Sequence, residues 1–140
     1  MKYRSRILIL VAALLLFGSV ARAQVIVIVN PGVSADSVSK AALEKIFTGT
    51  STRLGSGERV VPVLLKEGPV HSAFLSTYLG KSPIALIINW RSLVLSGQGS
   101  MPKSFDSEAE MVSYVARTPT AIGYIGEKTA HDSVKVLEVK

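Results

Sequence analysis

The chain has 140 residues, a formal net charge of +6 and no cysteine. The lack of thiols excludes disulfides, thiol catalysis and cysteine-based metal sites, so the fold must be held by packing alone. The positive charge does not indicate nucleic-acid binding, because four of the basic residues lie in an N-terminal segment that we expect to be removed.

The first 23 residues have the pattern of a cleavable export signal. Three basic residues precede an apolar run over residues 7–17, and Ala21-Arg22-Ala23 supplies a small-x-small cleavage site. An uncleaved anchor is the alternative, but this run is shorter than the roughly 20 residues that a spanning helix needs. We expect a single domain over residues 24–140 with a net charge of +2. Because no cysteine is available for lipid attachment, the predicted location is the periplasm of a two-membrane bacterium, as a soluble protein.

The mature chain opens with the β-branched run Val25 to Val29. A run without a polar face predicts a strand in the interior of a parallel sheet, buried on both sides. Asn30-Pro31-Gly32 ends it, and Ser39 is the predicted N-cap of a helix from Lys40 to about Thr48. The inward face of this helix is expected to carry Ala42, Leu43, Ile46 and Phe47.

Val60 to Leu65 is the second predicted strand. Pro62 cannot donate to a ladder, so this strand is expected to lie at an edge or to be irregular there. A turn over Lys66 to Pro69 leads to a helix from about His71 to Leu79, which turns Ala73, Phe74 and Leu75 inward.

The next helix begins at Ser82-Pro83 and runs to about Leu95. It is apolar nearly all round, which predicts either burial on more than one side or a face reserved for a partner. The narrow polar strip of Asn89, Arg91 and Ser92 favours burial.

Ser107 and Glu110 form a capping-box pair that opens a helix ending near Arg117. Ala121 to Ile125 is the third predicted strand, and Val134 to Val139 is a weaker fourth, expected at an edge. Strands that alternate with helices predict an α/β layered sheet, in which ligands bind beyond the carboxyl ends of the strands.

The predicted binding position lies at those strand ends. A helix that follows a strand directly aims free backbone N–H groups past the sheet edge and can hold a small oxyanion. Lys66 and His71 add cationic or polar groups, and Ser72 adds a hydroxyl donor. The alternative is a plain turn with His71 as a solvated first-turn residue. The candidate ligand-binding residues are Asn30, Lys66, Gly68, Val70, His71 and Ser72.

The sequence offers little to catalysis. Asp106, Glu108 and Glu110 fit helix capping better than chemistry, and no spacing supplies a metal site. His71 and Ser72 are adjacent on a helix, so they point about 100° apart, and no third orienting group accompanies them. We predict a protein that is not an enzyme and has no metal or cofactor.

Four stretches carry a resemblance to a known family. They are VIVNP at residues 27–31, S-x-x-x-L-x-x-I-F-x-G at 39–49, the strand-turn-helix at 60–74, and PTAIGYI at 119–125. In these the chain resembles the phosphate-binding subfamily of type 2 periplasmic substrate-binding proteins, the solute receptors of phosphate ABC importers. The resemblance implies an α/β/α sandwich corresponding to one lobe of a two-lobe receptor, as a truncated relative.

The chain also departs from that family. The receptors typically have arginine and then Ser-Gly-Thr before the second helix, where this chain has Leu64 and then Gly68-Pro69-Val70. Leu54 stands where the family often has tryptophan. With one lobe, a ligand cannot be enclosed by the monomer, so binding is expected to be weak or to need a second copy of the chain.

Two functions remain open. The first is an exported, non-enzymatic solute-binding-like protein for phosphate or a similar oxyanion, serving uptake or sensing. The alternative is a protein-interaction module of an envelope transporter, porin or sensor that has lost solute binding, motivated by the apolar helix over residues 83–95.

Overall fold

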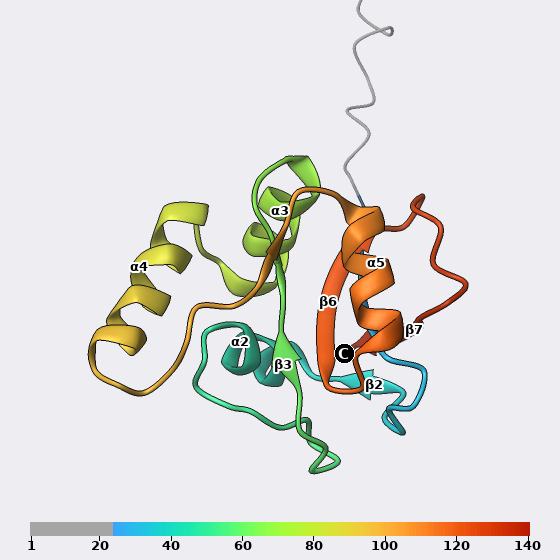
Figure 1. Cartoon of the computed structure of the whole chain (residues 1–140), viewed down its shortest axis with the longest axis horizontal. Helices are drawn as coiled ribbons and strands as arrows, with labels where there is room; N and C mark the ends of the chain where they lie inside the picture. The colour runs from blue at the N-terminus through green and yellow to red at the C-terminus, as the bar shows by residue number, and fades with distance from the viewer. Residues whose placement is uncertain (1–23) are drawn as a thin grey trace, which may run out of the picture.

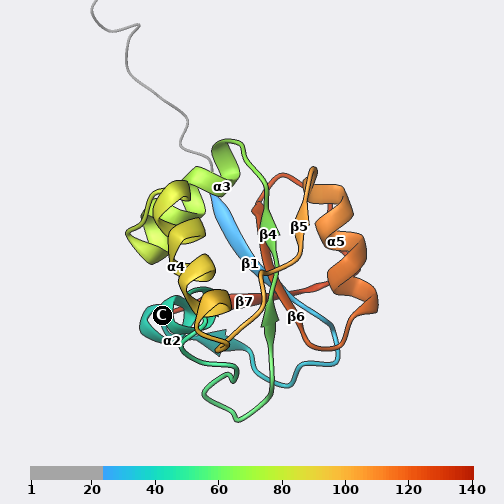
Figure 2. The same cartoon turned by 60° about the vertical axis from the view of Figure 1, so that its left-hand side comes forward.

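The chain folds as a mixed sheet between two layers of helices (Figures 1 and 2). The computed structural model describes residues 24–140. The predicted export signal, residues 1–23, lies outside the described part. The strands are β1 (Val25–Val29), β2 (Ser37–Val38), β3 (Val61–Pro62), β4 (Leu64–Leu65), β5 (Ser104–Phe105), β6 (Ala121–Gly126) and β7 (Lys135–Val139). The helices are α2 (Lys40–Phe47), α3 (Pro69–Phe74), the π-helical segment η2 (Leu75–Leu79), α4 (Pro83–Leu95) and α5 (Glu108–Arg117).

The main sheet has the strand order β2-β7-β1-β6-β3. The interior position predicted for β1 is confirmed, but its predicted parallel pairing is wrong, because β1 runs antiparallel to both β6 and β7. The other four strands share one direction, since β2 pairs parallel with β7 and β3 parallel with β6. The edge position predicted for β7 is also wrong, because the short strand β2 covers its outer side.

The predicted strand over residues 60–65 divides into two short pieces. β3, which contains Pro62, forms one edge of the main sheet, and Val63 separates it from β4. The edge position and the irregularity predicted from proline therefore both occur. β4 then pairs with β5 in a separate parallel pair.

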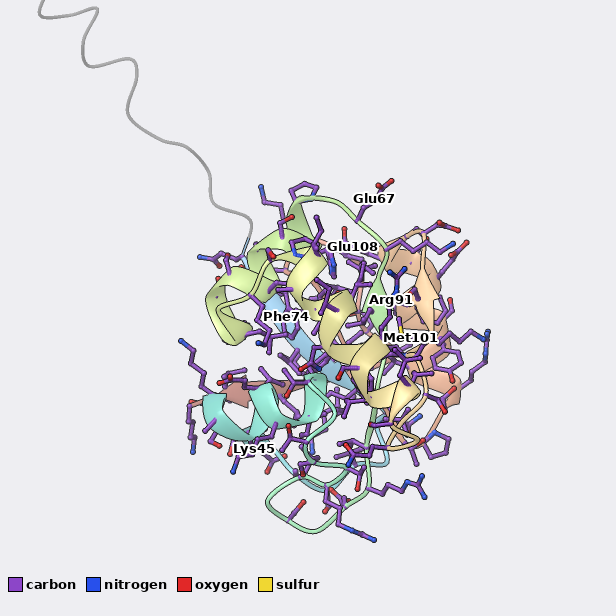
Figure 3. All side chains as sticks on the ribbon, turned by 90° about the vertical axis from the view of Figure 1, so that its left-hand side faces the viewer. Lys45, Glu67, Phe74, Arg91, Met101 and Glu108 are labelled. Carbon is purple, nitrogen blue, oxygen red and sulfur yellow. The ribbon has the colours of Figure 1, made fainter. Side chains whose placement is uncertain are left out.

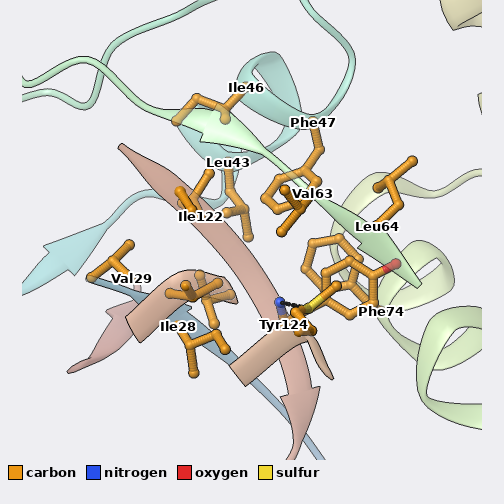
Figure 4. Close-up of a cluster of buried hydrophobic side chains, with 14 of the residues drawn as sticks. Ile28, Val29, Leu43, Ile46, Phe47, Val63, Leu64, Phe74, Ile122 and Tyr124 are labelled. Carbon is orange, nitrogen blue, oxygen red and sulfur yellow. Dashed lines mark hydrogen bonds between the residues drawn. The ribbon is translucent and has the colours of Figure 1, made fainter. Parts of the chain in front are cut away.

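The core lies between the sheet and its helices. Figure 2 shows α5 on one side of the strands and α2, α3 and α4 on the other. The rings of Phe74 and Tyr124 stack with centroids 3.9 Å apart, and Phe47 meets Phe74 edge-on at 4.8 Å (Figure 4). All three side chains are fully buried. Tyr124 belongs to β6, so this aromatic cluster fixes α2 and α3 on one face of the sheet.

The burial predicted for α4 is wrong. Only Leu86 and Trp90 of this helix are buried, and Trp90 donates its indole N–H to the carbonyl of Phe47 at 3.0 Å. Ile88 is 61% exposed and Leu95 is 88% exposed. α4 therefore rests on the domain by one side and presents a second apolar side to solvent (Figure 3).

Candidate functional site

The predicted binding position divides between two ends of the sheet. The carboxyl ends of β4 and β6 lie at one end, together with the start of α3. β1 runs against β6, so Asn30, which follows β1, lies at the opposite end. The Asn30 amide donates to the carbonyls of Val115 and Ala116 at 3.0 Å each, at the last turn of α5. The structure thus separates Asn30 from the other candidate residues, and its polar side chain closes a helix end.

The other candidate residues are brought together by the turn before α3. Gly68 is the N-cap, with φ at 109°, a conformation that a residue with a Cβ rarely adopts. The N–H of Ser72 donates to the carbonyl of Gly68 at 3.0 Å, as the first bond of the helix. No side chain caps this end, so the N–H groups of Val70 and His71 have no acceptor from the helix. Gly68 and Ser72 are both exposed.

The side chain of His71 faces the core. It is only 5% exposed, and its Nδ1 lies 2.5 Å from the hydroxyl oxygen of Tyr124. That hydroxyl also accepts the N–H of Leu65 at 2.9 Å, so one oxygen joins His71 to the backbone of β4. Burial lowers the pKa of His71 and raises the pKa of Tyr124 well above its usual range. The alternative expectation, that His71 is a solvated first-turn residue, is therefore wrong, because its imidazole is buried.

Acidic groups surround the turn. Lys66, its one lysine, pairs with Asp106 at 3.0 Å. Glu108 accepts the N–H of Gly126 at 2.6 Å, which brings a second carboxylate to this end. Glu67 and Glu108 lie at the same end of the molecule in Figure 3. An anion at the turn would meet more negative than positive charge, which weakens the attraction of the free amides.

A hollow of about 800 Å³ adjoins the turn through Pro69. Its wall includes the π-helical segment η2, and π-helical turns are frequent at functional sites. The lining residues are Gln24 just before β1, Val25 and Ile26 at the start of β1, Pro69 and Ala73 of α3, Ser76, Thr77 and Tyr78 of η2, and Glu127. The sequence gives no local signal for this hollow. Its polar members come from segments far apart in the chain, and no local pattern connects them.

Comparison with solved structures finds the same fold in phosphate receptors. A phosphate transport receptor of Vibrio cholerae is 15% identical with a TM-score of 0.61, over 82% of this chain and 45% of that chain. A phosphate ABC transporter substrate-binding protein of Clostridium perfringens, solved with bound phosphate, is 19% identical with a TM-score of 0.61, over 82% and 44% of the two chains. PstS of Borrelia burgdorferi is 18% identical with a TM-score of 0.56, over 83% and 47%.

The chain has the periplasmic-binding-protein fold. The α/β sandwich implied by the sequence resemblance is therefore confirmed. The chain spans less than half the length of these receptors, which is consistent with one lobe. No protein-family model matches the sequence, and no curated protein is significantly similar to it.

The described residues offer no place for a metal ion. Over residues 24–140, no three His, Cys, Asp or Glu side chains converge in a way that could ligate one. Within the same range, no helix is both long and apolar enough to cross a membrane. What the candidate site offers is two free backbone donors, the Ser72 hydroxyl and a polar hollow, which is chemistry for binding a small solute.

Proposed function

We propose that this protein is an exported, non-enzymatic solute-binding protein that holds a small oxyanion at the turn Lys66–Ser72. The carrying observation is the pair of N–H groups, on Val70 and His71, which lack helical acceptors at an exposed turn. They lie at the carboxyl ends of β4 and β6, where open α/β sheets bind ligands. Phosphate is the first candidate, since the fold is shared with phosphate receptors.

The acidic surroundings set the expected strength of this binding. Asp106 neutralises Lys66, and Glu108 and Glu127 lie close by without a cation from the turn to balance them. Pro69 also removes one backbone donor from the first turn. Weak binding follows, with a preference for a singly charged solute over the phosphate dianion.

The test is a thermal titration of the exported protein with phosphate, sulfate and small carboxylates. A ligand present at 100 times its dissociation constant adds about 2.7 kcal/mol to the stability and raises Tm. K66Q should reduce the response, because it leaves Asp106 unbalanced at the turn. K45Q makes the same charge change on α2, at the far end of the molecule from Glu67 (Figure 3), and should leave the response intact. A flat response to every anion rules out the proposal.

The exposed side of α4 supports a second candidate function. In this reading the protein is an interaction module for an envelope transporter, porin or sensor. Exposed aliphatic residues gathered on one helix are typical of an interaction surface. A photo-crosslinker placed at Ile88 should capture the partner in cells, whereas one at Val136, an exposed apolar residue of β7, should not. Equal capture at both positions, or none, contradicts this candidate.

A further inference from the structure

The outer face of α4 is an aliphatic surface that nothing in the described chain covers. We define it as Ile84, Ile87, Ile88, Arg91, Val94 and Leu95, which lie on the side of the helix opposite to Leu86 and Trp90. Ile84, Ile88 and Leu95 are all more than half exposed. Five of its six side chains are aliphatic. Water contact with so many aliphatic side chains is unfavourable, so a matching apolar surface would gain from covering them.

The helix carrying this face contacts the domain through the end of α2 and the residues that follow it. Trp90 donates its indole N–H to the carbonyl of Phe47 at 3.0 Å, and the Asn89 amide donates to the carbonyl of Thr48 at 2.8 Å. Gly49 lies so close to Trp90 and Leu93 that a Cβ there would collide with both side chains. These inner contacts turn the outer face away from the domain, and α4 stands as a ridge at the side of the molecule (Figure 1).

The charge around the outer face is positive. The stretch from Gly68 to Phe105 contains no acidic residue, and its charged residues are Lys81, Arg91 and Lys103. Lys103 is directed over the ring of Tyr114, 4.8 Å from the centroid, on the α5 side of the sheet. Lys81 and Arg91 remain beside α4, and neither makes a salt bridge within residues 24–140. The covering surface should therefore be anionic as well as apolar.

A shallow hollow on this face shows how both requirements are met together. It has a volume of about 490 Å³ and is lined by Ile88, Arg91, Ser92, Leu95 and Ser96. A guanidinium group and a serine hydroxyl suit a phosphate or carboxylate oxygen. The two aliphatic side chains beside them suit a hydrocarbon chain. Free phosphate would leave those side chains in water, whereas the head group and acyl chain of an anionic lipid satisfy both.

Size and charge disfavour a protein partner of ordinary dimensions. A stable protein interface uses about 20–30 residues on each side, often with Tyr or Trp at its centre. The outer face has six residues on one helix, and its one nearby indole, Trp90, is buried. A second copy of the chain would also bring Arg91 against a face that has no acidic group to receive it.

We propose that the outer face of α4 seats this protein on an anionic lipid surface. The aliphatic side chains enter the boundary between head groups and acyl chains, and the Arg91 stem lies among them with its guanidinium against lipid phosphate. The protein body covers the other side of the helix, as water covers the polar side of a free amphipathic helix. This inference is an alternative to the second candidate function, because it assigns the same face of α4 to a lipid surface instead of a protein partner.

The experiment uses the protein as the cell exports it, with its N-terminus identified by mass spectrometry so that every variant shares it. Sedimentation with phosphatidylcholine vesicles containing about 30% phosphatidylglycerol measures binding, and pure phosphatidylcholine vesicles are the neutral comparison. Wild type should bind the anionic vesicles and release them in high salt. I88Q/L95Q should weaken binding about tenfold, since two aliphatic side chains are lost from the boundary. R91Q should weaken it about fivefold.

The matched control is V61T/V136T, which makes two exposed aliphatic residues polar on β3 and β7, away from α4. It should bind like wild type, and circular dichroism should show that every variant is folded. Equal vesicle binding by wild type and I88Q/L95Q overturns the inference, as does failure of wild type to bind. If vesicles are not bound but Ile88 crosslinks to a protein, the inference falls and the second candidate function stands. A dimer that I88Q/L95Q dissociates would assign the face to a second copy and also overturn it.

Discussion

Replacing Tyr124 with phenylalanine tests the network that ties the start of α3 to the sheet. The Tyr124 hydroxyl accepts the N–H of Leu65 at 2.9 Å and pairs with Nδ1 of His71. Phenylalanine keeps the ring stacked on Phe74 and leaves no large cavity, so the change isolates the hydroxyl. The two partners that lose it are themselves buried.

The expected loss can be worked from those two partners. A buried polar group without a partner costs about 1–3 kcal/mol, and two such groups with some relaxation give about 2–4 kcal/mol. This is a large fraction of the ~5–15 kcal/mol typical of a domain. Urea unfolding followed by circular dichroism and by Trp90 fluorescence measures this loss of stability. The slope of the free energy of unfolding against urea concentration should be the same in Y124F as in wild type.

A control and a second variant make this prediction specific. Y114F removes a hydroxyl that has no hydrogen-bond partner within residues 24–140, so it should change the stability by less than about 0.5 kcal/mol. In a background with His71 replaced by leucine, Y124F should cost about 1 kcal/mol less, because only Leu65 then loses its partner. A stability for Y124F within about 0.5 kcal/mol of wild type would refute the reasoning.

Three further predictions follow from other contacts. N30A should cost about 1–2 kcal/mol in urea unfolding, because α5 loses two end contacts, yet it should leave the anion response unchanged; a lost response would return Asn30 to the site. Burial lowers the pKa of His71, so the unfolded chain binds a proton at this histidine more tightly than the folded chain does. The free energy of unfolding should therefore reach its full value above about pH 6.5 and decrease as the pH drops below it. In H71Q the free energy of unfolding should decrease less steeply over the same pH range. G123A should cost about 1–3 kcal/mol, since its Cβ would lie 2.8 Å from the sulfur of Met111, whereas G55A, with open space around it, should be near neutral; equal costs would contradict the packing argument.

Three helix starts were predictable from the sequence because their causes are local, whereas α3, which has no side-chain cap, begins at Pro69 instead of the expected His71. The hydroxyls of Ser39, Ser82 and Ser107 accept backbone N–H groups three residues on, at 3.1 to 3.2 Å. Each of these bonds spans a few residues, so residue type and spacing suffice to predict it.

Strand direction was not predictable in the same way. The run VIVIV is apolar on both faces and suits a buried strand of either direction. Direction depends on which strands lie beside it, and those strands come from the other end of the chain. This error also explains why Asn30 was expected beside the other candidate residues. A parallel β1 would end at the same edge of the sheet as β6, whereas the antiparallel β1 ends at the opposite edge.

The burial of His71 did leave a signal in the sequence. His71, Phe74, Leu75, Tyr78 and Leu79 follow the spacing of an inward helix face once the helix is allowed to begin at Pro69. The π-helical geometry of η2 left no signal in the sequence, because the segment has five residues and is too short to show a changed periodicity. The exposure of α4 also could not be decided, because the pattern shows how many faces are apolar but not how many are covered.

The central position of β1 has a consequence for how the polypeptide reaches its native state. Within residues 24–140, β1 is hydrogen-bonded on both sides by β6 and β7, two strands that come much later in the sequence. A nascent fragment that stops before Ala121 therefore cannot form the middle of the sheet, and its apolar strand β1 has no partner to pair with. Folding of the sheet therefore depends on contacts between residues far apart in the sequence, which makes it slow and leaves β1 unpaired until β6 and β7 have been synthesised.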